Sequence, residues 1–149
     1  MPRLLFCSLA FALAASQANA QPSSGFCSTL TRVVAESPSG FKSIITGPAI
    51  SRGERPVSIS FPGMKAATGD ACHIQAMGNS YVCTAGLGAD FPALDAKVKA
   101  CLTGWKLDHM ASEGTTLNTY ISPKGHTEVG VSKDSEDVYL NIHENNDPQ

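Results

Sequence analysis

The stretch ACHIQAMGNSYVCTAG, residues 71–86, decides the fold, because two cysteines lie eleven positions apart on either side of a Gly-Asn pair. Runs of strand-forming residues flank that pair, which predicts a β-hairpin. A two-residue loop would place Cys83 opposite Ile74. A four-residue loop would place it opposite Cys72, with Ile74 opposite Tyr81. In both registers these four side chains share one face of the hairpin.

The first 20 residues have the layout of a secretory signal peptide. Arg3 gives a positive end, residues 4–15 form an almost unbroken apolar run, and small residues stand at positions 18 and 20, as a cleavage site requires. The apolar run is shorter than the ~20 residues of a transmembrane helix, and we expect no membrane span elsewhere. We therefore predict cleavage after Ala20 and a single domain over residues 21–149, located in the periplasm or outside the cell.

The chain has 5 cysteines, of which Cys7 would leave with the signal peptide. The remaining even number predicts two disulfides in an exported protein. There is no Cys-x-x-Cys pair, which argues against a zinc site and a thioredoxin-type redox centre. We predict one disulfide across the hairpin, Cys72–Cys83, and the other between two helices, Cys27–Cys101. The main alternative joins Cys83 to Cys101, because a helix that folds back over its preceding strand would bring them together, and pairs the other two.

Two segments have the apolar spacing of amphipathic helices, residues 24–37 and residues 89–107. In the second, Asp90 is a good N-cap, Pro92 suits the first turn, and Gly104 is a plausible end. Its apolar stripe consists of Leu94, Val98, Cys101, Leu102 and Trp105.

Strand patterns fill most of the remaining chain. Period-two alternation of apolar and polar residues occurs at residues 55–63, 115–122, 126–133 and 137–144. Together with the hairpin, these segments give the order α-βββ-α-βββ. Helices segregated from antiparallel hairpins indicate an α+β fold, in which two helices cover one face of an antiparallel sheet.

The turn Pro123-Lys124-Gly125 fits a three-residue hairpin loop and so fixes the phase of the strands on either side. The predicted cross-strand pairs are Leu117 with Val131, Thr119 with Val129, and Ile121 with Thr127. From this phase we expect one face of the meander to be exposed and to carry Tyr120, Glu128, Tyr139 and His143. We expect the other face to be buried and to carry Leu117, Val129, Val131, Leu140 and Ile142.

The loop of the last hairpin sets which polar groups meet on the exposed face. A loop of residues 134–135 would place His126 opposite His143, whereas a loop of residues 134–137 would place Glu128 opposite His143. Two imidazoles and a carboxylate suit zinc or copper, so metal handling by His126, Glu128 and His143 is one hypothesis. The competing interpretation is an ordinary solvated sheet face.

Motifs for catalysis are scarce. Ser39 and Lys42 have the Ser-x-x-Lys spacing of penicillin-recognising serine enzymes, but the companion motifs of that class are absent. We therefore expect a non-enzymatic protein without a cofactor, while a small exported hydrolase with an unrecognised site is the alternative.

The function that the sequence favours is an exported binding module. Without Arg3 the mature chain has 10 basic and 13 acidic residues, a balance that argues against nucleic acid as a partner. We expect the partner to be another protein or a small ligand of the cell envelope. Tyr120, Glu128, Tyr139 and His143 are the predicted contact residues, because tyrosine offers a large contact area with few rotatable bonds.

Overall fold

The computed structural model describes residues 24–64, 71–75, 77, 79–86, 89–135 and 137–145. The predicted signal peptide, residues 1–20, lies outside this part of the chain. Among the helices that are described, none has the length and apolar character needed to cross a membrane.

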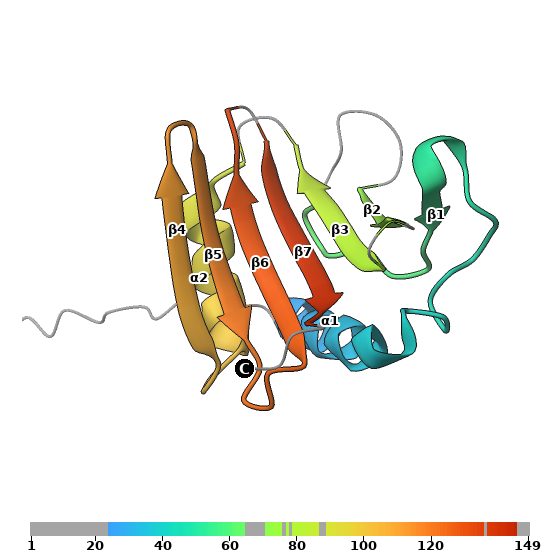
Figure 1. The fold of residues 1–149 in the computed structure, drawn as a ribbon, viewed down its shortest axis with the longest axis horizontal. Coiled ribbons are helices and arrows are strands. Elements are labelled where there is room, and N and C mark those ends of the chain that lie inside the picture. Colours follow the sequence, from blue (N-terminus) through green and yellow to red (C-terminus); the bar gives the residue numbers. More distant parts are fainter. Residues whose placement is uncertain are drawn as a thin grey trace, which may run out of the picture.

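Among the described residues, two α-helices pack on one face of a seven-stranded antiparallel sheet, which confirms the predicted α+β class (Figure 1). The helices are α1 (Ser24–Glu36) and α2 (Phe91–Cys101). The strands are β1 (Glu54–Pro56), β2 (Cys72–Gln75), β3 (Ser80–Ala85), β4 (Lys106–Ser112), β5 (Thr115–Ile121), β6 (Thr127–Lys133) and β7 (Val138–Glu144). Their order across the sheet is β1-β2-β3-β7-β6-β5-β4, so β3 pairs with the last strand of the chain and joins its two halves.

Helix α2 begins where the sequence predicts but ends at Cys101, so Leu102 and Trp105 of the predicted apolar stripe lie just beyond it. The carboxylate of Asp90 accepts a hydrogen bond from the backbone N–H of Ala93 at 3.3 Å, which satisfies a free donor of the first turn. Gly104, with a φ of 84°, lies in the turn after the helix and leads the chain into β4. β4 itself was not predicted, since the sequence analysis gave the second half three strands and the structure has four.

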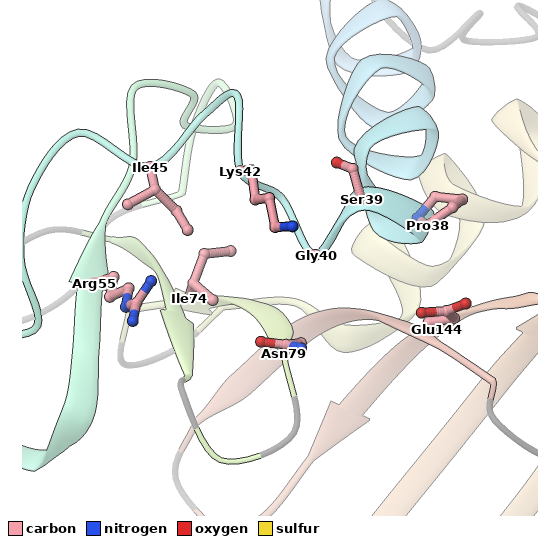
Figure 2. Close-up of a pocket in the computed structure, with 9 residues that line it drawn as sticks. All are labelled: Pro38, Ser39, Gly40, Lys42, Ile45, Arg55, Ile74, Asn79 and Glu144. Carbon is pink, nitrogen blue, oxygen red and sulfur yellow. The ribbon is translucent and has the colours of Figure 1, made fainter.

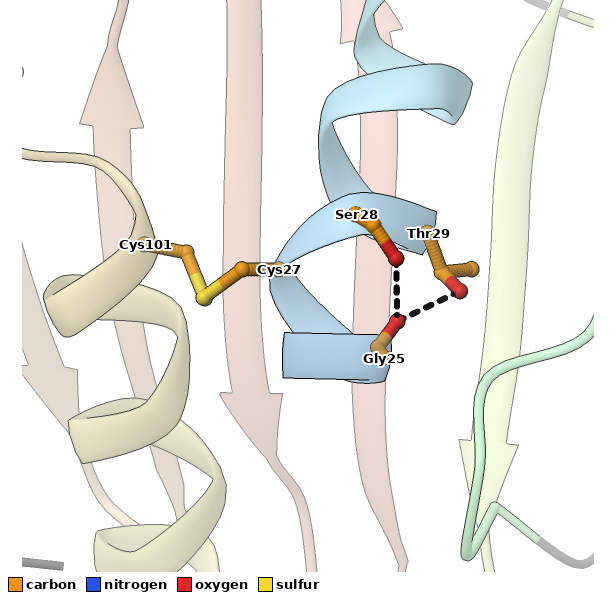
Figure 3. Close-up of a disulfide and its surroundings, with 5 residues drawn as sticks. All are labelled: Gly25, Cys27, Ser28, Thr29 and Cys101. Atoms are coloured by element: carbon orange, nitrogen blue, oxygen red, sulfur yellow. Dashed lines mark hydrogen bonds between the residues drawn. A yellow bond between two sulfur atoms is a disulfide. The ribbon is translucent and has the colours of Figure 1, made fainter. Parts of the chain in front are cut away.

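Both predicted disulfides are confirmed. Cys27–Cys101 joins the first turn of α1 to the end of α2, as Figure 3 shows, with a Cα–Cα distance of 5.2 Å. Beside it in α1, the hydroxyl groups of Ser28 and Thr29 both donate to the carbonyl oxygen of Gly25. Cys72–Cys83 links directly opposite residues of β2 and β3, which is the register of the four-residue loop.

The core lies between the helices and the sheet. Its largest fully buried side chains include Leu30 of α1, Val98 of α2 and Tyr81 of β3. The hydroxyl of Tyr81 donates to the carbonyl oxygen of Ile59 at 2.6 Å, so this polar group is satisfied inside the core. The strand predicted over residues 55–63 is shorter than expected. Only Glu54–Pro56 forms β1, and Ile59 reaches the core from a non-strand segment.

The phase predicted for β5 is wrong by one residue. The β5–β6 turn has four residues, because the N–H of Ser122 donates to the carbonyl oxygen of Thr127, and Tyr120 therefore lies opposite Val129. Tyr120 is 2% exposed and faces the helices, where its hydroxyl donates to Asp95 of α2 at 2.8 Å.

The predicted core set is confirmed except for one residue. Leu117, expected in the core, is half-buried on the other face. The other four residues of the predicted core set are buried, namely Val129, Val131, Leu140 and Ile142.

Candidate functional site

The face of the sheet that points away from the helices is the candidate site, and we call it the outer face. Three neighbouring strands supply its central residues through the cross-strand pairs Glu128–His143, Gly130–Asn141 and Ser132–Tyr139. Helices α1 and α2 both lie behind the sheet in Figure 1, so neither covers this face.

The outer face carries three of the four predicted contact residues. Glu128, Tyr139 and His143 lie there and are half-buried rather than fully exposed. Tyr120 lies on the opposite face because of the shifted phase of β5, so the expectation that all four side chains are exposed together is wrong.

Glu128 is held in place by two neighbours. The Nε2 atom of His143 lies 3.1 Å from its Oε2 atom, and the side-chain amide of Asn145 donates to its Oε1 atom at 2.8 Å. The loop of the last hairpin has four residues, as in the second predicted register. Fixed partners on both oxygens give this carboxylate a defined orientation on a strand, which a binding site needs.

The predicted metal ligands are not all brought together. The side chain of His126 is exposed in the turn before β6. Its backbone carbonyl oxygen accepts a hydrogen bond from the N–H of Asn145 at 2.9 Å. Within the described residues, no group of three or more histidine, cysteine, aspartate or glutamate side chains is placed to hold a metal ion.

The outer face is hollowed in two adjoining places. One hollow of about 300 Å³ is lined by Gln75, Ser80, Val82, Leu117, Thr119, Glu128, Gly130, Asn141 and His143. A second, of about 290 Å³, is lined by Glu128 together with Lys106, Lys124, Asn145 and five neighbouring residues. Glu128 therefore lines both hollows, one that includes the apolar side chains of Val82 and Leu117 and one that includes two lysines.

Sequence reasoning missed most of the residues that line the hollows. Val82 and Asn141 meet there because β3 pairs with β7, a neighbour that follows it only after α2 and three further strands. One signal was available, since a glycine inside a strand pattern such as Gly130 often marks an open or closely approached site. A Cβ atom at Gly130 would lie 3.5 Å from Cδ1 of Leu117.

Tyr139 keeps its proton at neutral pH. Partial burial raises the pKa of its hydroxyl, and the negative charges of Asp134 and Asp137 raise that pKa further. The hydroxyl lies 3.4 Å from a carboxylate oxygen of Asp137, to which it donates. It is thus a neutral donor at the rim of the outer face.

A third hollow, of about 320 Å³, contains the Ser39 and Lys42 pair and is drawn in Figure 2. The hydroxyl of Ser39 donates to the backbone carbonyl oxygen of Glu36 at 2.8 Å. A hydrogen bond from Ser43 lowers the pKa of the Glu36 carboxyl, and one from Ser39 adds to this effect. The hydroxyl of Ser39 is thus directed toward Glu36, whereas an activated serine donates to a neighbouring base such as a lysine amine.

No family model, curated protein or solved structure matches this chain. The interpretation of its function therefore depends on the geometry of the outer face.

Proposed function

We propose that this protein is an exported binding module and that its outer face holds a segment of another protein. The observation that supports this most strongly is the outer face itself. In the part of the chain that the structure describes, α1 and α2 both lie on one side of the sheet, while the other side has two adjoining hollows that share Glu128. Concave sites that combine apolar side chains with a few oriented polar groups are typical binding sites.

The chemistry of the larger hollow suits a polypeptide. Val82 and Leu117 offer apolar contact, while Asn141 offers both a donor and an acceptor at its amide group. An extended segment has alternating side chains and backbone amides that match such a mixture. Glu128, whose two oxygens are already oriented, would favour a donor or a positive charge on the partner.

The disulfides support export. Cys27–Cys101 and Cys72–Cys83 persist in oxidising compartments and are rare in the reducing cytosol. A partner in the cell envelope or outside the cell follows from this location.

Site-specific photo-crosslinking tests the proposal. A photoreactive phenylalanine derivative replaces Tyr139 on the outer face or, as the matched control, exposed Ala100 on α2. Both proteins are expressed with their leader in the native host and irradiated in intact cells. We expect a discrete adduct with one protein from position 139 and none from position 100. If position 139 gave no adduct, or if both positions gave the same adducts, binding at the outer face would be contradicted.

A further inference from the structure

The third hollow, drawn in Figure 2, contains charges of both signs that are not paired with one another. Lys42, Arg55 and Glu144 line it, and all three side chains are exposed. Within the described residues, the ion pairs of the structure involve other side chains, so none of these three charges has a charged partner. Two positive groups and one negative group are therefore available to a ligand in this hollow.

The register of the sheet places Arg55 and Glu144 on the same face. Arg55 of β1 lies opposite Ile74 of β2, which lies opposite Tyr81 of β3. Tyr81 in turn lies opposite Ile142 of β7, and Glu144 follows two positions later in the same strand. Directly opposite residues, and residues two apart in a strand, share a face. Because Tyr81 and Ile142 belong to the core, both charged side chains lie on the helix side of the sheet, opposite to the outer face.

The same register keeps the two charges apart. β2 and β3 lie between β1 and β7, so the backbones of β1 and β7 are three strand spacings, or about 14 Å, from each other. Side chains stand roughly perpendicular to a sheet, so the guanidinium of Arg55 and the carboxylate of Glu144 are separated by a similar distance. A ligand that contacts both groups therefore needs a negative charge near one end and a positive charge near the other.

Two further polar groups come from the other walls of the hollow. Figure 2 shows the side chain of Lys42 reaching in from the segment after α1, between Arg55 and Glu144. Asn79, at the start of β3, lies close to the end of α1, since a Cβ atom at Gly40 would be 3.7 Å from its Nδ2 atom. Within the described part of the chain, the side-chain amide of Asn79 has no hydrogen-bond partner. It therefore offers both a donor and an acceptor to a ligand.

We propose that this hollow binds a short peptide with free termini, about three residues long. Its terminal carboxylate would lie between Arg55 and Lys42, and its terminal ammonium would lie at Glu144. An extended peptide spans about 3.3 Å per residue, so three residues with a hydrogen bond at each end fit a separation of about 14 Å. A free amino acid is too short to reach both ends.

The remaining features of the hollow favour a peptide over other ligands that carry opposite charges. The amide of Asn79 matches the donor and acceptor of a peptide bond, and half-buried Ile45 offers apolar contact to a side chain. The volume of about 320 Å³ is at the lower end of the range for ligand pockets, which suits a small ligand. Because this site and the outer face lie on opposite sides of the sheet, the proposal does not depend on the function proposed above.

NMR titration of the isotope-labelled mature protein with L-alanyl-L-alanyl-L-alanine (trialanine) tests the proposal. We expect saturable shifts of the backbone amide signals of Lys42 and Asn79. N-acetyl-trialanine lacks the ammonium and trialanine amide lacks the carboxylate, so each should bind at least about threefold more weakly than trialanine. Absence of saturable shifts at these residues, or equal binding of the blocked peptides, would overturn the proposal. Binding of inorganic phosphate as tightly as trialanine would do so too, because phosphate needs only the two positive groups.

Two variants assign the ends of the peptide. Arg55→Gln should weaken trialanine at least about threefold but leave trialanine amide unchanged, and Glu144→Gln should weaken trialanine but leave N-acetyl-trialanine unchanged. Lys99→Gln and Glu113→Gln, the matched changes at exposed positions outside the hollow, should bind all three peptides like the parent. The amide spectrum of each variant shows whether it is folded. Loss of trialanine and its blocked form to the same extent in either variant would contradict the assigned contacts.

Discussion

Replacing Tyr120 with alanine is a stringent test of how β5 is placed in the fold. The side chain is 2% exposed between the sheet and α2, and its hydroxyl donates to Asp95 at 2.8 Å. Truncation of a buried aromatic side chain costs about 3–5 kcal/mol in the free energy of unfolding. Tyr120→Phe isolates the hydroxyl and should cost only about 1 kcal/mol, because the half-buried Asp95 can recover water as a partner.

Tyr139 supplies the matched comparison from the outer face. Its side chain is half-buried, and its hydroxyl makes a long contact to Asp137 at 3.4 Å. We expect Tyr139→Ala to cost less than about 1 kcal/mol, in the range of ordinary surface changes.

Urea unfolding with the disulfides intact measures all three variants. The fluorescence of Trp105, the only tryptophan and half-buried against the core after α2, reports the transition. A loss of about 3–5 kcal/mol would be a large share of the total stability of a domain of this size. If Tyr139→Ala lost as much stability as Tyr120→Ala, the assignment of the two faces would be wrong.

Two further predictions concern the disulfides and alkaline pH. Removing Cys27–Cys101 by a pair of alanine substitutions should cost about 4 kcal/mol and removing the hairpin disulfide about 3 kcal/mol, because the sequence separations are 74 and 11. Urea unfolding measures both, and the reverse order would contradict the estimate. Burial raises the pKa of Tyr81 and of Tyr120 above the usual value near 10, so in alkali the unfolded chain loses these protons before the native protein does. The free energy of unfolding should therefore fall above about pH 10 by roughly 1.4 kcal/mol per pH unit for each tyrosine, and Tyr120→Phe should reduce this slope, whereas an unchanged slope would contradict the burial of Tyr120.

The parts of the fold that the sequence predicted have strong local signals. Asp90 marks the start of α2, Gly104 marks the turn into β4, and the spacing of Cys72 and Cys83 restricts the hairpin to two registers. The sequence could not choose between those registers, because both keep the same residues on one face.

The sequence did not show which face of β5 is buried, because its apolar residues occur at both odd and even positions. Leu117 and Ile121 are odd-numbered and Tyr120 is even-numbered, so alternation alone allows either face to be buried. The contact with Asp95 of α2, which lets the tyrosine hydroxyl enter the core, is a tertiary feature that a strand pattern does not contain. β4 was missed for a related reason, since a strand exposed on both faces has no apolar alternation.

The hollows of the outer face depend on strand order. Gly130 and Asn141 are neighbours across β6 and β7, but Val82 joins them only because β3 pairs with β7 and not with a strand that is closer in sequence. Hairpin patterns predict pairs of strands that follow one another in sequence, whereas the long-range pair β3–β7 joins the two halves of the sheet. The candidate site was therefore predicted in part, through Glu128, Tyr139 and His143.

The affinity of the crosslinked partner for two valine variants is the most direct test of binding at the outer face. A Cβ atom at Gly130 would make only ordinary contacts, at 3.5 Å from Leu117 and 3.8 Å from Asn141. We therefore expect Gly130→Val to fold and its two methyl groups to fill part of the larger hollow. By isothermal titration calorimetry we expect it to bind the partner at least about tenfold more weakly, a loss of about 1.4 kcal/mol. Ala100→Val, on the exposed side of α2, should bind like the parent. Equal affinity of Gly130→Val and the parent protein would contradict binding at the outer face.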